Sequence, residues 1–421
     1  MNRIAQLFRV PDLRKKILVV VGLLLAYRIL ASIPVPGIDA GRLQQYFAGN
    51  QFLGFLNFFS GGGLSHLSVV MLGVGPYITA TIIMQLLTII FPRMKEMYYE
   101  EGQRGQAKFN QYSRLITVPL AAVQSYGFMS LLISQGVIDR PDAFGFLRNI
   151  IVISAGSMLA LWLGELITEQ KVGNGISLLI FAGIVSGLPT AAARALAAYT
   201  PGLLMSYGAF VIVFILLVMG IVFLNEGERR VPIAYARQVR GSKMWGGAQT
   251  YLPMKVNQAG MIPLIFAISV LLFPQFIAQL AMLISNPVGL KINEFVTSFL
   301  ANQLLYGIFY FLLVFIFTYF YTAITFNPEE VAKNLQKGGG FIPGVRPGDA
   351  TAKYFSRVTS HITFFGALFL GFIAVLPILV QSATGVAVLS ISGTAILIVV
   401  AVALETMRQI DSQLSVREYD N

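Results

Sequence analysis

The stretch SGGGLSHLSVVMLGVGPYITA, residues 60–80, decides how the rest of the sequence is interpreted. It is apolar enough for a membrane, but it opens on three glycines and is interrupted again at GVGP. An unbroken helix over 64–91 would be about 42 Å long at ~1.5 Å per residue, whereas the hydrocarbon core of a bilayer is only ~30 Å thick. The stretch therefore predicts one crossing, over 76–91, preceded by a short piece that does not span.

Irregular backbone at membrane depth is tolerated only where it is buried in protein or lines a water-filled cavity. The short piece, about 60–72, therefore predicts a re-entrant half-helix that enters from the outer side and turns back at GVGP. The alternative is an ordinary Gly/Pro kink joined to a helix at the membrane interface. This segment alone does not choose between the two.

The composition indicates a polytopic membrane protein. The 421 residues are 56% hydrophobic and 12% charged, against about 25% charged residues in a soluble domain. There is no cysteine, which excludes disulfides and thiolate metal sites, and only two histidines, His66 and His361. The Walker A, HExxH and GxSxG motifs are also missing from the sequence. The sequence therefore predicts no enzyme, no metal site and no cofactor.

The hydrophobic pattern predicts ten membrane spans. They are 17–33, 76–91, 115–135, 149–167, 174–188, 203–224, 260–284, 303–325, 358–380 and 386–407. Numbering them in order assigns 24 of the 30 Lys and Arg residues to connections on one side and only 5 to the other. Cytoplasmic connections carry the Lys/Arg excess, so both termini are expected in the cytoplasm.

The predicted fold class is an all-α polytopic membrane protein. Five spans precede the connection near residue 190 and five follow it, so an internal repeat would have to be inverted. We expect an N-terminal half over 1–190, which includes the half-helix, and a C-terminal half over 191–421. The second half carries two long cytoplasmic loops, about 225–259 and 326–357.

Several apolar residues lie next to Gly or Pro breaks in the predicted spans. They are Val74, Ile78, Ile176, Ile180, Ile265 and Ile398. The first four form two pairs spaced i, i+4, and each pair faces one way on its helix. Together the residues could form an apolar constriction that gates by excluding water. The alternative is that branched aliphatics merely fill membrane helices, and spacing does not separate the two interpretations.

The two long loops combine basic residues with turn and strand signals. In 225–259, ERRVPIAYA alternates like a strand and GSKMWGG resembles a hairpin tip. In 326–357, NPEEVAKNLQK predicts a short capped helix, followed by a Gly/Pro turn that presents Arg346. The other candidate docking residues are Arg229, Arg230, Arg237, Arg240 and Lys243. Such loops could dock a large anionic partner, or they could only set topology and bind anionic headgroups.

Seven motifs, taken together, resemble the SecY family, the channel subunits of bacterial Sec translocons. The motifs are RILASIPVPGID, FSGGGLSHLSVVMLGVGPYITATIIMQLL, WLGELITEQKVGNGISLLIFAGIVSGLP, ERRVPIAYARQ, LPMKVNQAGMIPLIFA, FNPEEVAKNLQKGGGFIPGVRPG and TAKYFSR. The resemblance runs in order from about residue 10 to 415. It implies a channel that passes unfolded secretory polypeptides across the membrane and releases hydrophobic segments sideways into lipid.

The resemblance also implies roles for individual residues. The half-helix is the family's plug, with Gly61, Gly62, Gly63, Leu64, Ser65, His66 and Leu67. The six apolar residues form its pore ring, and the lateral gate contains Thr79, Thr81, Gln124 and Asn257. The basic residues of the two loops, Arg346 above all, are the docking residues. The implied partners are SecE, usually SecG, the SecA ATPase, the ribosome, signal sequences of translocating polypeptides, and membrane lipids.

A small-solute carrier built from inverted repeats is the rival hypothesis. It explains the broken helix and the topology. It does not explain the organised loops or the scarcity of carboxylates within the spans, which an ion-coupled carrier needs.

Overall fold

The computed structural model describes most of the chain. The described residues are 10–418 except 37–62, 65–66, 100, 135, 137, 140, 198–199, 236–237, 241–242, 246–248, 284–286 and 385–392. They are divided into two compact units. The first unit comprises Met1–Thr200, Ser269–Ala301 and Val402–Asn421, and the second comprises Pro201–Ile268 and Asn302–Ala401.

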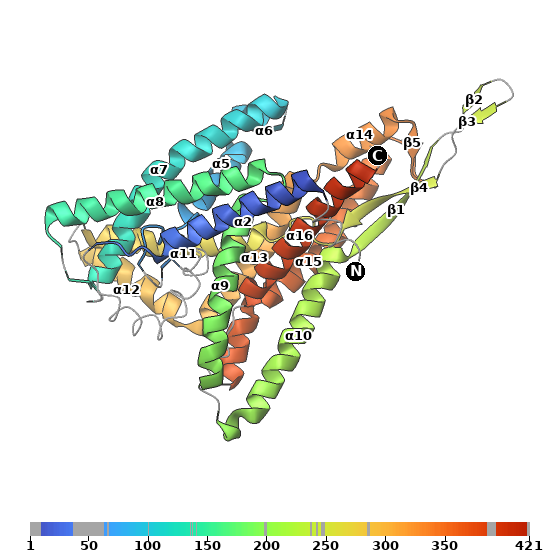
Figure 1. Cartoon of the computed structure of the whole chain (residues 1–421). Coiled ribbons are helices and arrows are strands. Elements are labelled where there is room, and N and C mark those ends of the chain that lie inside the picture. Colours follow the sequence, from blue (N-terminus) through green and yellow to red (C-terminus); the bar gives the residue numbers. More distant parts are fainter. Residues whose placement is uncertain are drawn as a thin grey trace. The chain divides into compact units, whose positions relative to one another are not determined.

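The structure confirms the all-α prediction, because every predicted span overlaps a helix (Figure 1). These helices are α2 (Pro11–Ser32), α5 (Gly75–Ile90), α7 (Gly102–Ser134), α8 (Ala143–Glu169), α9 (Gly175–Ala197), α10 (Leu204–Glu226), α11 (Ile262–Leu283), α13 (Gln303–Thr325), α15 (Asp349–Thr384) and α16 (Gly393–Glu418). Within the described ranges, five helices are long and apolar enough to cross a membrane individually. A sixth span results if α5 and the following helix form one broken span.

In the first unit, α8 packs against α2, α5, α7 and α9. Two glycines bring α8 and α9 close together: a Cβ added to Gly175 would lie 1.8 Å from the carbonyl oxygen of Gly164. The Gly175 amide donates to the Thr168 hydroxyl at 2.9 Å across the same contact. Small residues at helix crossings are typical of membrane bundles, because there the backbones can approach closely.

The predicted loop 92–114 is largely helical, which corrects the sequence prediction. Helix α6 (Pro92–Tyr99) follows α5 at a bend of 112°, and α7 begins already at Gly102. The charged residues of this connection are typical of a loop, but α6 also has an apolar face that packs against α5 and α7. Met97 is buried against Phe109 of α7 and Met84 of α5, in a satellite cluster.

In the second unit, α15 packs against α10, α13 and α14 (Pro328–Lys337). Asn327 caps α14 as the sequence predicts, since its side chain accepts from the Glu329 amide at 3.1 Å and the Glu330 amide at 3.4 Å. Strand β1 (Glu228–Tyr235) pairs with β4 (Gln249–Lys255) on one side and with β5 (Gly340–Phe341) on the other, both antiparallel. The predicted strand over ERRVPIAYA is therefore confirmed.

A second hairpin, β2 (Gln238–Arg240) with β3 (Lys243–Trp245), lies beyond the ends of β1 and β4 (Figure 1). The sequence predicts a tip over GSKMWGG, but KMW pairs with QVR as a strand. In this register Val239 is the backbone partner of Met244. The connection between the two strands is therefore shorter than predicted.

Candidate functional site

The start of α5 fixes the first two residues of the predicted pore ring. Val74 is the N-cap residue of α5, after a turn in which Gly73 has φ 52°, and Pro76 lies in the first helical turn. The Ile78 amide donates to the Val74 carbonyl at 3.1 Å, so both residues lie on one face of the first turn. Both side chains are buried. The predicted break at GVGP is therefore confirmed as the point where α5 begins.

The start of α9 fixes the next two residues. The Asn174 side chain accepts from the amides of Ile176 at 3.1 Å and Ser177 at 3.2 Å, which defines the first helical turn. Ile180 is buried and Ile176 is partly buried. These contacts, with the Gly164–Gly175 approach, hold the two isoleucines in place on the first unit.

The remaining two ring residues belong to the second unit. Ile265 lies in the first turns of α11 and Ile398 in those of α16, and both are buried. The closure of all six residues into one ring remains a prediction, because the two units are each described separately.

The predicted plug is partly described. Gly61, Gly62, Ser65 and His66 lie outside the described residues, while Gly63, Leu64 and Leu67 are buried. The described residues before α5, at 63–64 and 67–74, form turns and one β-bridge where the sequence predicts a half-helix. Leu64 and Leu67 belong to a buried cluster that also contains Val35, Met71, Phe128, Met129, Leu132, Ile138 and Ile153.

The predicted lateral-gate residues make specific hydrogen bonds within their own units. Gln124 Nε2 on α7 donates to Thr79 Oγ1 on α5 at 3.3 Å. Thr81 instead bonds the Tyr77 carbonyl of its own helix at 2.9 Å. In the second unit, Asn257 Nδ2 donates to Asn225 Oδ1 at 2.9 Å. The structure thus brings Thr79 and Gln124 together, and the role of these residues as a gate remains a prediction.

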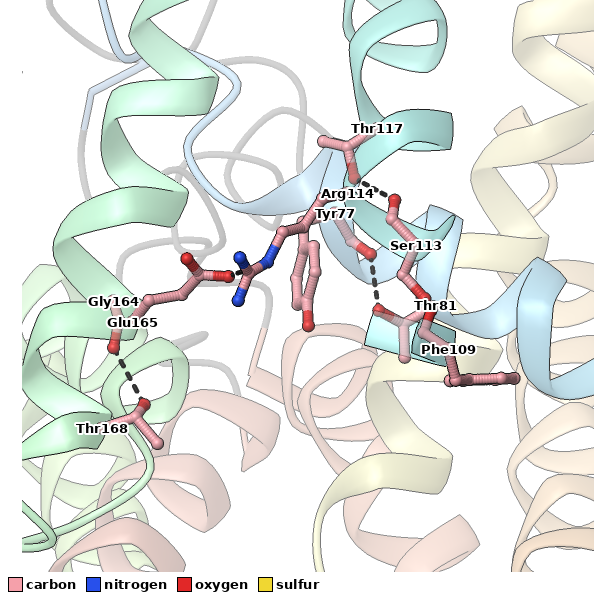
Figure 2. A network of polar contacts seen from close by, with 9 residues as sticks. All are labelled: Tyr77, Thr81, Phe109, Ser113, Arg114, Thr117, Gly164, Glu165 and Thr168. Carbon is pink, nitrogen blue, oxygen red and sulfur yellow. Dashed lines mark hydrogen bonds and ion pairs between the residues drawn. The ribbon is translucent and has the colours of Figure 1, made fainter. Parts of the chain in front are cut away.

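A polar network between α5, α7 and α8 is not predicted by the sequence (Figure 2). Arg114 Nε lies 2.5 Å from Glu165 Oε1, and Figure 2 shows the arginine reaching from α7 toward α8 beside Tyr77. The two charges lie far apart in the sequence, on helices assigned to different spans, so no local pattern indicates their pairing. Thr117, Ser113 and Thr168 each bond a carbonyl one turn earlier, which satisfies their hydroxyls within the helices.

Three of the predicted docking residues, Arg229, Arg230 and Arg346, belong to a packed body in the second unit. A buried cluster of Val231, Met254, Ala332, Ile342 and Phe355 joins β1, β4, α14, the segment after β5, and α15. Arg229 and Arg230 are exposed on β1. Arg240 is the backbone partner of Lys243 in the β2–β3 hairpin, and Arg237 lies outside the described residues.

Arg346 is exposed in a turn bounded by two glycines of positive φ, Gly344 at 82° and Gly348 at 98°. Residues with a side chain rarely adopt these angles. The Arg346 carbonyl accepts from Thr351 Oγ1 at 2.9 Å, and the Val345 amide donates to the Ile342 carbonyl at 3.0 Å. The turn is therefore built to present Arg346 outward from a fixed base.

Within the described ranges, no cluster of three or more His, Asp or Glu side chains could hold a metal ion. The described part of the chain has three features that bear on function. They are apolar side chains at helix starts, a buried segment before α5, and an exposed basic turn. None of these is a catalytic arrangement.

The comparisons with known proteins agree with one another. A family model described as SecY matches residues 68–407. The protein translocase subunit SecY of Streptomyces galbus is 42% identical over 434 residues, which cover 99% of this chain and 98% of the relative. A solved structure described as "The structure of a protein conducting channel" has a TM-score of 0.65 at 20% identity, over 93% of this chain and 90% of that chain. A structure of a SecY protein whose plug domain is described as maintaining a membrane seal has a TM-score of 0.62 at 19% identity, over 92% and 89%.

Proposed function

The chain belongs to the SecY family, and from this premise we propose that it is a protein-conducting channel that passes unfolded polypeptides across a membrane. The observation that carries the proposal is the 42% identity to a protein translocase subunit over nearly the full length of both chains. Two features of the structure fit this function: the apolar residues at the helix starts and the buried segment before α5. A small-solute carrier is not favoured by any of these observations.

We propose that Val74, Ile78, Ile176, Ile180, Ile265 and Ile398 form the narrowest part of the pore. A translocating chain is chemically arbitrary, so a pore with specific hydrogen bonds would hold some segments too strongly. Aliphatic side chains leave no polar group unpaired, and an apolar constriction resists ion flow by dewetting. The starts of α5 and α9 support this role, because four of the six residues lie within the first turns of these two helices.

The plug closes the resting channel on one side of the ring. The burial of Leu64 and Leu67 among residues of α7 and α8 supports this role, since the segment has an apolar seat in the protein. Opening then requires the plug segment to leave this apolar site. Loss of buried leucines from the seat costs free energy, so the closed state is favoured until a polypeptide engages.

Hydrophobic segments leave sideways through a seam between α5 and α7 on one side and α11 and α13 on the other. Partition of a segment into lipid follows its transfer free energy, with about −0.3 to −0.6 kcal/mol for Leu and about +3 kcal/mol for Arg or Asp at the centre of a span. The Gln124–Thr79 hydrogen bond joins α5 to α7, the two helices on one side of this seam.

The cytoplasmic loops dock the partners that drive transport. In this proposal the SecA ATPase or the translating ribosome supplies the energy. SecE and usually SecG complete the complex, which resides in the bacterial plasma membrane with both termini in the cytoplasm. The exposed Arg346 turn supports docking, because its glycines and its base fix the charge in one place.

Reconstitution tests the proposed function. We expect vesicles that contain the chain with SecE to import an unfolded secretory precursor into a protease-protected state when SecA and ATP are added. Vesicles without the chain are the control. Precursor that remains accessible to protease in both preparations, with SecA demonstrably bound, would contradict the proposal.

A further inference from the structure

Helix α12 (Pro287–Ala301), labelled in Figure 1, is too short to cross a membrane. Its 15 residues give a length of about 22 Å, whereas the hydrocarbon core is ~30 Å thick. It is also separate from the span that follows. Asn302, the single residue between α12 and α13, has an extended backbone, and its side chain accepts from the amides of Leu304 at 3.2 Å and Leu305 at 3.3 Å. Helix α13 therefore begins anew with its own cap.

The chain connection places α12 at a membrane surface. Helix α13 has 23 residues, or about 34 Å, so its two ends lie near the two surfaces of the membrane. Consecutive Cα atoms are ~3.8 Å apart, so the end of α12 cannot lie far from the start of α13. The other end of α13 leads to α14 and the Arg346 turn. Helix α12 therefore belongs to the membrane surface opposite that turn.

The sequence of α12 separates into an apolar and a polar stripe. Apolar residues recur at i, i+3, i+4 and i+7 and share one face of the helix, namely Ile292, Phe295, Val296 and Phe299. Lys291, Glu294 and Ser298 form the neighbouring polar stripe, and all three are exposed. Leu290, in the first turn, is an exposed apolar residue outside the apolar stripe. The helix is thus amphipathic over most of its length.

The apolar stripe is covered by protein along one edge only. Val296 and Phe299 are partly buried, whereas Phe295 is 73% exposed and Ile292 is 37% exposed. An exposed aromatic ring at the end of a membrane span lies at the depth where lipid head groups meet acyl chains. Amphipathic helices with Phe and Leu on one face bind at this boundary.

The charges of α12 fit the same orientation. At 3.6 residues per turn, Lys291 lies about 40° from Phe295 around the helix axis, and Glu294 lies about 100° from it. With Phe295 in the acyl chains, the Lys291 ammonium can extend to the level of the phosphates beside it. The Glu294 carboxylate then lies further toward water. One charge of each sign also means that apolar contact, rather than attraction to anionic lipid, dominates.

The lipid-facing surface of the chain begins directly after α12. Leu304, Leu305 and Ile308, in the first turns of α13, are exposed apolar side chains of a membrane span. Only Asn302 separates this surface from α12. The phospholipid that covers the start of α13 is therefore within reach of the exposed edge of α12.

We propose that α12 is an interfacial helix that binds the phospholipid leaflet through Ile292 and Phe295, at the boundary between head groups and acyl chains. Because α12 lies between α11 and α13 in the chain, its depth in the leaflet sets the depth at which α13 begins. This inference goes beyond the proposed function, since it does not depend on what the channel conducts.

Tryptophan fluorescence tests the proposal, because bromine on a lipid chain quenches a tryptophan that it contacts. The chain has two tryptophans, and Trp162→Phe with Trp245→Phe removes both. Phe295→Trp then keeps an aromatic ring at the test position. The full chain with SecE is placed in phosphatidylcholine vesicles that carry bromine either close to the head group or near the ends of the acyl chains. Ser298→Trp reports on the polar stripe, and Leu312→Trp, at an exposed position in the middle of α13, reports on the membrane interior.

We expect Phe295→Trp to lose about half or more of its emission to bromine close to the head group, because interfacial helices bury their apolar face by ~5–10 Å. Bromine near the ends of the acyl chains should quench it less. Leu312→Trp should show the opposite order, and Ser298→Trp should keep most of its emission. Added salt should leave the quenching of Phe295→Trp unchanged, since screening acts on charges and not on apolar contact.

Three results would overturn the proposal. Emission of Phe295→Trp that bromine does not quench, while Leu312→Trp is quenched, would show that α12 lies in water or is covered by protein. Equal quenching of Phe295→Trp and Ser298→Trp would contradict the orientation. Stronger quenching of Phe295→Trp by the deep bromine would place α12 in the membrane interior. Ile292→Trp is the second variant on the apolar stripe and should repeat the result of Phe295→Trp. The readout does not use export, so failure here and failure of the proposed function are separate results.

Discussion

Arg114 on α7 and Glu165 on α8 form an ion pair in which the arginine Nε lies 2.5 Å from the glutamate Oε1. The same two helices supply the apolar seat of the plug, through Phe128 and Met129 on α7 and Ile153 on α8. One helix pair therefore carries a polar contact and, about three to four turns along each helix, the plug contacts. A change in the separation of α7 and α8 would therefore alter both the Arg114–Glu165 ion pair and the contacts of the plug.

The Arg114–Glu165 pair is expected to stabilise the first unit only modestly. Half of the arginine side chain is exposed, so water screens the attraction. We predict a coupling energy of about 0.5–1 kcal/mol between Arg114→Gln and Glu165→Gln, measured by a double-mutant cycle of thermal unfolding in detergent. The more exposed pair Lys108–Glu101, at 3.6 Å, is the control and should show less coupling. Equal coupling in the two pairs would contradict the prediction.

Serine in place of Ile78 or Ile180 should hydrate the pore ring. A hydroxyl in an apolar constriction offers water a hydrogen-bond partner, so dewetting weakens. We predict a several-fold rise in the resting ion permeability of vesicles that contain either variant. The conservative variants Ile78→Val and Ile180→Val are the controls and should retain the seal. Unaltered permeability in the serine variants would count against the ring.

Alanine in place of Gly156 should disturb the seat of the segment before α5. The added Cβ would lie 2.0 Å from the Val69 carbonyl oxygen, so the backbone must shift. Overpacking of this kind typically costs about 1–3 kcal/mol, and we predict both a lower unfolding temperature and a leak of ions through the resting channel. Gly187→Ala on α9 is the matched control, since nothing lies within 4 Å of the Cβ it would add. A Gly156→Ala channel as stable and as tight as this control would refute the close approach.

Charge reversal at Arg346 should impair motor-driven export and leave assembly intact. The residue is exposed on a fixed turn, and its side chain is outside the buried cluster of the second unit. We predict that Arg346→Glu lowers the rate of SecA-driven export by about tenfold or more, as a loss of ~1.4 kcal/mol of docking free energy would do. Lys333→Glu, an equal change at an exposed position of α14, is the control. Normal export by Arg346→Glu would remove the residue from the docking role.

The sequence predicts the helices well where breakers and apolar runs coincide. GVGP marks the start of α5, the last glycine of GNG is the first residue of α9, and Asn327 caps the start of α14 with its side chain. These signals are local, because each depends on residues within one helical turn. The same reasoning underestimates α6 and the beginning of α7, where Met97 and Phe109 meet only after the chain bends by 112°.

The contacts that hold the site are not visible in the sequence, because they join residues far apart in the chain. Nothing near Gly156 indicates that the carbonyl of Val69 lies against it. The bridge between Pro34 and Ser68 likewise pairs two short segments with no strand pattern of their own. The sequence places Arg114 in the charged connection between two predicted spans. Its pairing with Glu165 depends on how α7 and α8 pack.

The proposed function requires a polypeptide to pass through the apolar ring, and site-directed disulfide formation can detect this passage. A single cysteine replaces Ile78, a second is placed in a stalled secretory polypeptide, and Ile151→Cys, on an exposed face of α8, is the control. We predict a disulfide at Ile78→Cys that requires SecA and ATP, and none at Ile151→Cys. No disulfide at Ile78→Cys, Ile180→Cys or Ile265→Cys, with the polypeptide demonstrably engaged, would contradict it and place the pore elsewhere.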